Sequence, residues 1–123
     1  EREARLAIGD HSAGLVHLAS KLQKHSEAEN VMMTIGSEGV FIQTRIQNEL
    51  QELMTDRIPA LNSTPLDVAG GGDSLLVTSA MSLAVGASIW EAAMLGSCAA
   101  AIQVSRIGNL PIHKQDIFNE LLK

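Results

Sequence analysis

The stretch Asp67-Val68-Ala69-Gly70-Gly71-Gly72-Asp73 decides how the rest of this sequence is interpreted. Three consecutive glycines lie between two carboxylates, directly before an apolar run with helical spacing. Glycine has no Cβ, so its amide can come close to a ligand, and the first amides of a helix have no partner within that helix. The helix dipole adds roughly half a positive charge at this end. The stretch therefore predicts a corner that binds an anion such as phosphate.

An anion-binding corner alone does not explain Asp73, because its carboxylate repels an anion. The residue fits the role of a base that takes a proton from a hydroxyl attacking a phosphate. The alternative is that Asp73 is only the N-cap of the following helix. The stretch is neither a Walker loop nor a dinucleotide fingerprint, because no Gly-Lys-Ser/Thr follows the glycines and their spacing differs.

The composition indicates a single soluble, globular domain over residues 1–123. Apolar residues make up 46% of the chain and charged residues 19%, which excludes a disordered protein. The net charge of −5 and the scarcity of aromatic residues argue against a nucleic-acid partner. No apolar run reaches the roughly 20 residues of a membrane span. The chain begins without methionine, which indicates a fragment or a processed chain.

Cysteine and histidine usage gives no sign of a metal centre. Cys98 is the only cysteine, so no internal disulfide and no cysteine-based zinc cluster can form, and a reducing cytoplasm is the expected compartment. Its place in an apolar run predicts a small core residue. The histidines lack metal-ligand spacing and are predicted to lie on the surface. They are His11, His17, His25 and His113.

Hydrophobic spacing and turn residues predict the order helix, strand, strand, strand, glycine turn, helix, helix, which is typical of a layered α/β domain. The expected helices cover residues 1–8, 74–86, 88–106 and 113–123, with one more helix capped by Ser12, and the expected strands cover residues 30–35 and 39–44. A third strand, over residues 57–61, is implied by the resemblance described below. The polar residues 45–56 form either a further extended segment or a surface loop.

Several side chains have a predicted direction. In the helix after Ser12, Leu18 faces a sheet and Gln23 faces solvent. Ser88 and Glu91 form a capping box that starts a helix. Small residues along the 74–86 helix predict a close approach to a neighbouring helix. The apolar side chains of the last helix are expected to face inward, and these are Ile117, Phe118, Leu121 and Leu122.

The glycine stretch resembles the second signature of the ribokinase-like (PfkB) carbohydrate kinases, Asp-Thr-x-Gly-Ala-Gly-Asp, with Asp67, Gly70, Gly72 and Asp73 in register. Residues 34–39, Thr-Ile-Gly-Ser-Glu-Gly, resemble the Thr-x-Gly-x-x-Gly segment of the same family. Residues 1–4 resemble the tail of its Asn-x-x-Glu-Ala segment. The resemblance implies a layered α/β/α ribokinase-like domain, of which this chain is the C-terminal portion with a partial central sheet.

The resemblance also implies roles for single residues. The amides of Gly70, Gly71 and Gly72 would form an anion hole for the transferred phosphoryl group, and Asp73 would be the catalytic base. Glu3 would help to organise Mg²⁺ through water. Nucleotide contacts would fall to Thr34, Gly36, Gly39, Ser97 and Asn109, with the loop around residues 105–109 near the adenine. The implied cofactors are ATP and Mg²⁺, and the implied partners are a nucleotide and a sugar or sugar phosphate.

Some positions depart from the family pattern, and some readings stay open. Val68 stands where the family has threonine, so its monovalent cation is not carried over, and Gly71 replaces alanine. Ser97 stands where the family often has asparagine. Residues 34–39 also fit an ordinary hairpin with glycines at its turn.

The function implied is ATP-dependent phosphorylation of a sugar hydroxyl. The Ala-rich second helix after the glycines and the stretch Arg106-Ile107-Gly108-Asn109 resemble the heptose-phosphate kinase branch. The chain alone is expected to be inactive and to self-associate through an exposed sheet edge and apolar surface, giving a possible homo-oligomer. The alternative is a non-catalytic remnant that binds a nucleotide or serves only a structural role.

Overall fold

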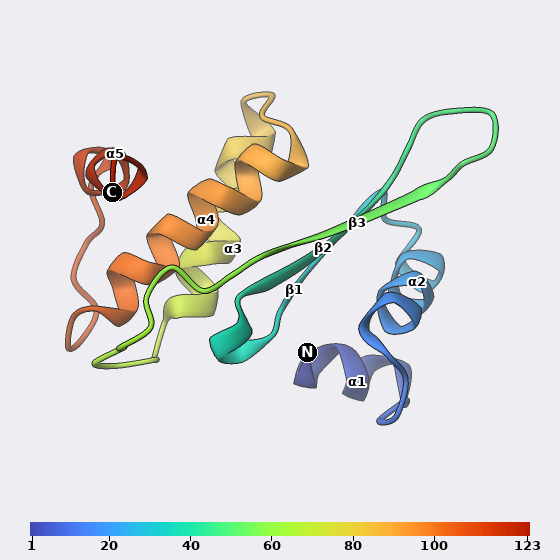
Figure 1. Cartoon of the computed structure of the whole chain (residues 1–123), viewed down its shortest axis with the longest axis horizontal. Helices are drawn as coiled ribbons and strands as arrows, with labels where there is room; N and C mark the ends of the chain where they lie inside the picture. The colour runs from blue at the N-terminus through green and yellow to red at the C-terminus, as the bar shows by residue number, and fades with distance from the viewer. The chain divides into compact units, whose positions relative to one another are not determined.

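The computed structural model describes residues 1–123, which divide into two compact units, Glu1–Ile58 and Pro59–Lys123 (Figure 1). The first unit contains two helices and all three strands, and the second contains three helices. This element order confirms the α/β class expected from the sequence. The single domain expected over the whole chain stays a prediction.

The first unit is an antiparallel sheet with helices packed on it. Its elements are α1 (Arg2–Ile8), α2 (Leu15–Ser26), β1 (Asn30–Thr34), a 3-10 turn (Gly36–Glu38), β2 (Val40–Arg45) and β3 (Leu53–Ile58). The strands lie in the order β1-β2-β3, with Met33 opposite Phe41 and Phe41 opposite Arg57. Residues 45–56 therefore include a strand, so the extended reading of this segment is confirmed in its second half. The strand expected at 57–61 begins earlier and ends at Ile58.

The core of the first unit lies between α2 and the sheet. Leu18 and Ala19 from α2 are fully buried and lie in one cluster with Met33 and Phe41, as the helical spacing predicted. Gln23 was expected to face solvent, but it is 1% exposed. Its Oε1 accepts a hydrogen bond of 2.6 Å from Gln43 Nε2 of β2, and its own Nε2 donates to the Glu29 carbonyl. Because its amide has partners, a polar residue can occupy the buried face.

The start of α2 differs from the sequence prediction. Its N-cap is Gly14, and no side chain caps it, so the prediction of Ser12 as the cap was wrong. The Ser12 amide and hydroxyl donate instead to Asp10 Oδ1, which also accepts from the Ala13 amide at 2.9 Å. Asp10 thus closes a local turn between α1 and α2, and this turn delays the helix by two residues.

The second unit is built around a pair of neighbouring helices, α3 (Gly71–Ala84) and α4 (Ile89–Val104), followed by α5 (Lys114–Leu121) (Figure 1). The helix pair is closely packed because small residues meet. A Cβ added to Gly96 would collide with Ser79 Oγ and lie 2.9 Å from the Leu75 carbonyl oxygen. Ser79 is fully buried and donates to the Ala92 carbonyl at 2.9 Å. The expected close approach of this helix to a neighbour is confirmed.

The beginning of α4 is the capping box predicted from the sequence. Ser88 Oγ accepts from the Glu91 amide, and Glu91 accepts from the Ser88 amide and hydroxyl, each at 2.8 Å. These two donors hold the pKa of Glu91 below its ordinary value. In the middle of α4, Cys98 is 1% exposed, which confirms it as a core residue. Burial, with the negative charge of Glu120, raises the pKa of its thiol.

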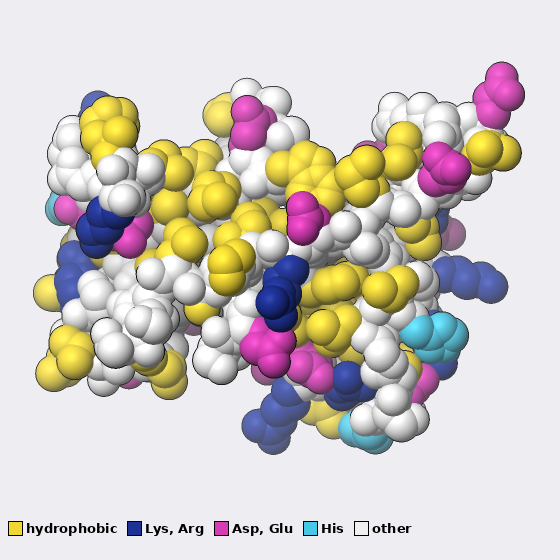
Figure 2. Space-filling model, in the orientation of Figure 1, with side chains coloured by type: hydrophobic (Ala, Val, Ile, Leu, Met, Phe, Trp, Pro, Cys, Tyr) yellow, Lys and Arg dark blue, Asp and Glu magenta, His cyan; other side chains and the backbone are white.

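The last helix is less buried than its pattern predicted. Ile117 is partly buried, but Phe118 is 55% exposed, and Leu121 and Leu122 are exposed as well, so the inward prediction was wrong for these three. α4 is the main packing partner of α5, and one neighbouring helix cannot cover the whole apolar side of another. Figure 2 shows hydrophobic side chains on the surface of this unit, over α4 and α5. The histidines are all exposed, as expected. The structure has no helix with the length and apolar character needed to cross a bilayer.

Candidate functional site

The glycine stretch forms a turn that opens into α3. Gly70 is the N-cap, with a left-handed backbone (φ 77°, ψ −3°) that favours glycine. The first residues of the helix are Gly71, Gly72 and Asp73. Asp73 is therefore the third helical residue and not the N-cap, so the capping alternative was wrong.

The amides at this helix start point out of the helix without partners. The Gly72 and Asp73 amides have no acceptor within the chain, and the Gly71 amide lies 3.5 Å from the Val68 carbonyl oxygen. Gly72 and Asp73 are exposed, and a Cβ added to Gly72 would meet nothing within 4 Å, so the surface beside these amides is open. The Asp73 side chain is exposed and makes no hydrogen bond. Free amides, an open approach and the positive end of a 14-residue helix suit an anion.

The turn is held in place by the end of α4. The amides of Leu66 and Asp67 both donate to the Val104 carbonyl, at 2.8 and 3.2 Å. Gly71 is buried against the same residue, where an added Cβ would lie 2.8 Å from Val104 Cγ1. Asp67 Oδ1 accepts from the Ala69 amide at 3.0 Å, which closes the bend from within. The turn is therefore held by backbone hydrogen bonds to Val104, by the Asp67 carboxylate and by close packing that leaves no room for a side chain at Gly71.

The loop after α4 lies against the same turn. A Cβ on Gly70 would lie 3.2 Å from Asn109 Oδ1, so Asn109 and the glycines are brought together as the resemblance implied. Gln103, which sequence reasoning did not single out, donates from Nε2 toward the Ala69 and Gly108 carbonyls and toward Asn109 Oδ1. A lone glutamine inside the run Ala99-Ala100-Ala101-Ile102-Gln103-Val104 was the only signal for it.

Ser97 lies apart from this arrangement, within the buried part of α4. It is 6% exposed, and its Oγ has no hydrogen-bond partner in the chain. No contact joins it to the glycine turn. Its nucleotide role stays a prediction.

The remaining predicted residues lie in the first unit, three of them around an open hollow of about 610 Å³. Glu3 lines it from the first turn of α1, and Thr34 and Gly36 line it from the end of β1 and the following turn. Gly39 closes that turn with φ 99° and is not part of the lining. The hairpin reading of residues 34–39 is confirmed, and it does not exclude a nucleotide contact.

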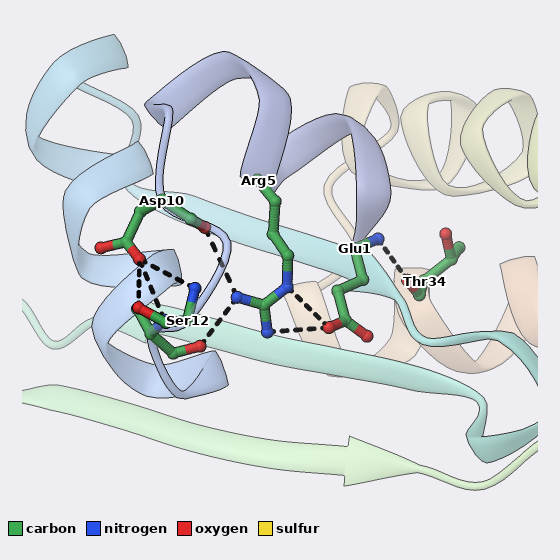
Figure 3. A network of polar contacts seen from close by, with 6 residues as sticks. Glu1, Arg5, Asp10, Ser12 and Thr34 are labelled. Atoms are coloured by element: carbon green, nitrogen blue, oxygen red, sulfur yellow. Dashed lines mark hydrogen bonds and ion pairs between the residues drawn. The ribbon is translucent and has the colours of Figure 1, made fainter.

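Glu1, Arg5 and Thr34, which line this hollow, belong to a polar network that extends beyond it to the turn before α2 (Figure 3). Arg5 donates to Glu1 Oε1 and to the Ala13 carbonyl, each at 2.8 Å, and so joins α1 to the turn before α2. Lys21 Nζ lies 2.7 Å from Asp10 Oδ2. This ammonium, with the Ala13 and Ser12 amides, holds the pKa of the Asp10 carboxyl well below its usual range. No group of three or more His, Cys, Asp or Glu side chains could hold a metal ion without other ligands.

The model of the pfkB family carbohydrate kinases matches residues 1–114. The bifunctional protein HldE of Desulfatibacillum aliphaticivorans is 29% identical over 124 residues, covering 98% of this chain but 24% of that protein. The chain spans less than a quarter of the curated relatives it matches.

Two solved structures show the same fold at low identity. Escherichia coli phosphofructokinase-2 in complex with potassium matches with a TM-score of 0.79 and 16% identity, over 99% of this chain and 38% of that one. Arabidopsis thaliana ribokinase complexed with ribose and ATP matches with a TM-score of 0.76 and 18% identity, over 98% and 38%. Both support a partial ribokinase fold for this chain.

Proposed function

The chain belongs to the pfkB family of carbohydrate kinases, and on that premise we propose that it carries the phosphate-handling part of an ATP-dependent kinase. The reaction is transfer of the ATP γ-phosphoryl group to a hydroxyl of a sugar or sugar phosphate. The single observation that carries this proposal is the start of α3, where free amides of Gly72 and Asp73 face open space beside an exposed carboxylate.

In the proposed mechanism, the amides of Gly70, Gly71 and Gly72 form the anion hole for the equatorial oxygens of the γ-phosphoryl group, joined by that of Asp73. The Asp73 carboxylate accepts the proton of the sugar hydroxyl. At the same time the hydroxyl oxygen bonds to the γ-phosphorus, and the bond between this phosphorus and the ADP oxygen breaks. An anion hole of this kind contributes a factor of roughly 100 to 1000 in rate for each donor.

Mg²⁺ is part of the proposal, with ATP as its main ligand. Because no cluster of acidic side chains could hold the ion, it would be bound by phosphate oxygens and water, with the single carboxylate of Glu3 acting through water. The ion would offset phosphate charge. Thr34, Gly36, Gly39, Ser97 and Asn109 are the proposed nucleotide neighbours. A heptose phosphate is the first acceptor to test, because the sequence after the glycines resembles that branch.

Nucleotide binding is testable on the chain as it stands. We expect MgATP to raise its melting temperature, and Gly72→Val to abolish this shift by filling the space in front of the amides. Ala80→Val adds the same side chain on the exposed face of α3 and should retain the shift. Sedimentation velocity on the same samples reports whether the chain self-associates, as the exposed side chains of Leu76, Val77 and Met81 favour.

Catalysis needs a protein that also contains a sugar site. In a kinase that includes this chain, Asp73→Asn should lower kcat by a factor of about 100 to 10,000, because a general base is lost, while ATP affinity changes little. Retained turnover in Asp73→Asn would contradict the assignment of the base. An unaltered melting temperature of the wild-type chain with MgATP would favour the structural-remnant alternative, which Val68 also favours.

A further inference from the structure

Gln103 occupies an unusual position at the end of α4. It is 6% exposed although every residue beside it in the run Ala99–Val104 is apolar. Its Nε2 lies 3.2 Å from the Gly108 carbonyl oxygen, 3.4 Å from Asn109 Oδ1 and 3.5 Å from the Ala69 carbonyl oxygen. One side-chain amide therefore faces three acceptors that belong to two separate segments.

These segments are the two ends of the proposed nucleotide site. Ala69 precedes the N-cap Gly70, so its carbonyl belongs to the turn that presents the free amides. Gly108 and Asn109 belong to the loop after α4, which the family resemblance places near the adenine. The only other side-chain hydrogen bond between the segments runs from the Gly108 amide to Asp67 Oδ2 at 3.5 Å, and it is exposed to solvent. The hydrogen bonds of Gln103 are part-buried, so they are the better protected link.

The contacts are long, so each of them is weak by itself. Their common donor is buried, however, and each acceptor that loses it is left with water as its only alternative partner. All three partners are acceptors, so the position requires a donor. Glutamate has the same shape but would place a carboxylate against three oxygens, and methionine would leave those oxygens without a donor.

We infer that Gln103 is a positioning residue that couples the glycine turn to the 108–109 loop, so that the phosphate end and the adenine end become ordered together. The names of the two ends rest on the proposed function, but the coupling itself does not. Binding of an anion at the turn then reduces the mobility of the loop without touching it, since both segments share one donor.

Hydrogen exchange of the chain without ligand tests the coupling directly. We expect Gln103→Glu to speed exchange about 5- to 30-fold in the hydrogen-bonded amides of residues 66–71 and of residues 105–110 together, as for a loss of one or two kcal/mol. Gln103→Met should give a smaller increase in both segments. Gln115→Glu adds the same charge on α5, where Gln115 Nε2 donates only to Asn119, and should change neither segment. Faster exchange in one segment alone, or an equal effect of Gln115→Glu, would overturn the inference.

A donor-retaining variant separates coupling from general destabilisation. Gln103→Lys keeps N–H donors at this position and should retain most of the protection in both segments. If Gln103→Lys and Gln103→Met lose protection equally, the donor is not what matters and the inference fails. This comparison remains decisive even if Gln103→Glu does not fold.

Inorganic tripolyphosphate, which carries phosphate without adenine, gives a readout that a purely structural role would not change. In the wild-type chain it should slow exchange both at residues 70–73 and at residues 105–110, and in Gln103→Met only at residues 70–73. Protection that reaches residues 105–110 equally in both proteins would overturn the coupling. If tripolyphosphate protects neither segment of the wild type, the proposed phosphate site fails, while the exchange data without ligand still decide the role of Gln103.

Discussion

The two units hold their candidate residues by different physical means. In the second unit the glycine turn is fixed by backbone hydrogen bonds to Val104 and by contacts that leave no room for a Cβ at Gly71. In the first unit Arg5 and Glu1, which line the hollow, are joined by an ion pair, and Lys21 and Asp10 form a second ion pair at the turn before α2. The glycine turn should therefore be more sensitive to added volume, and the Asp10 turn should be more sensitive to pH.

The largest effect is expected where two helices of the second unit nearly touch. Gly96→Ala places a methyl group against Ser79 Oγ and the Leu75 carbonyl, and overpacking of this kind costs about 1–3 kcal/mol. Trp90, the only tryptophan, lies at the start of α4, so its fluorescence during urea unfolding follows this unit. A wild-type midpoint for Gly96→Ala would mean that volume does not limit the helix pair.

A smaller effect should separate two neighbouring glycines within the turn. Gly71→Ala brings a methyl group to 2.8 Å from Val104 Cγ1 and should destabilise the second unit by about 1 kcal/mol. Gly72→Ala meets nothing within 4 Å and should be neutral or stabilising by up to about 1 kcal/mol, because alanine favours a helix. Urea midpoints of the two variants give the difference. Equal midpoints would show that the turn is not limited by volume.

The smallest effect concerns acid and the first unit. The folded-state pKa of Asp10 is lowered, so its stabilising contribution is complete above its unfolded value of about 4 and is lost as the pH falls through the folded value. Hydrogen exchange of residues 10–24 should therefore become faster on acidification in the wild type, beyond the intrinsic change in exchange rate. Asp10→Asn should remove most of this pH dependence.

The glycine turn serves as the internal control for that experiment. Exchange of residues 66–74, corrected in the same way, should depend less on pH than that of residues 10–24. Glu91 also has a lowered pKa, but it lies at the opposite end of α4 from Val104. If hydrogen exchange of residues 66–74 depends on pH as strongly as that of residues 10–24, the expected difference between the units is contradicted.

The parts of the fold that the sequence predicted are those set by local chemistry. The Ser88–Glu91 capping box, the glycine turn before α3 and the buried face of α2 follow from residue type and spacing. The glycine pattern also made the candidate anion site visible, because a backbone-built site requires glycines at fixed positions.

The predictions that failed depended on contacts that hydrophobic spacing does not specify. Gln23 is buried because Gln43 Nε2 of β2 donates a hydrogen bond to its Oε1, and no local pattern specifies this pair. Ser12 does not cap α2 because its amide and hydroxyl donate to Asp10 Oδ1 instead. The sequence did not show that Gln103 links the glycine turn to the loop after α4. Its acceptors lie 34, 5 and 6 positions away, and these separations follow no helical pattern. Phe118 is exposed because too few neighbours surround α5, which amphipathic spacing does not report.

The buried sulfur of Cys98 has a practical consequence. Because the thiol is enclosed in α4 and its pKa is raised, an alkylating reagent reaches a reactive thiolate only when the helices part. The rate at which this one atom is consumed therefore measures how often the second unit opens. The alkylation rate of Cys98 thus reports this opening without an introduced label.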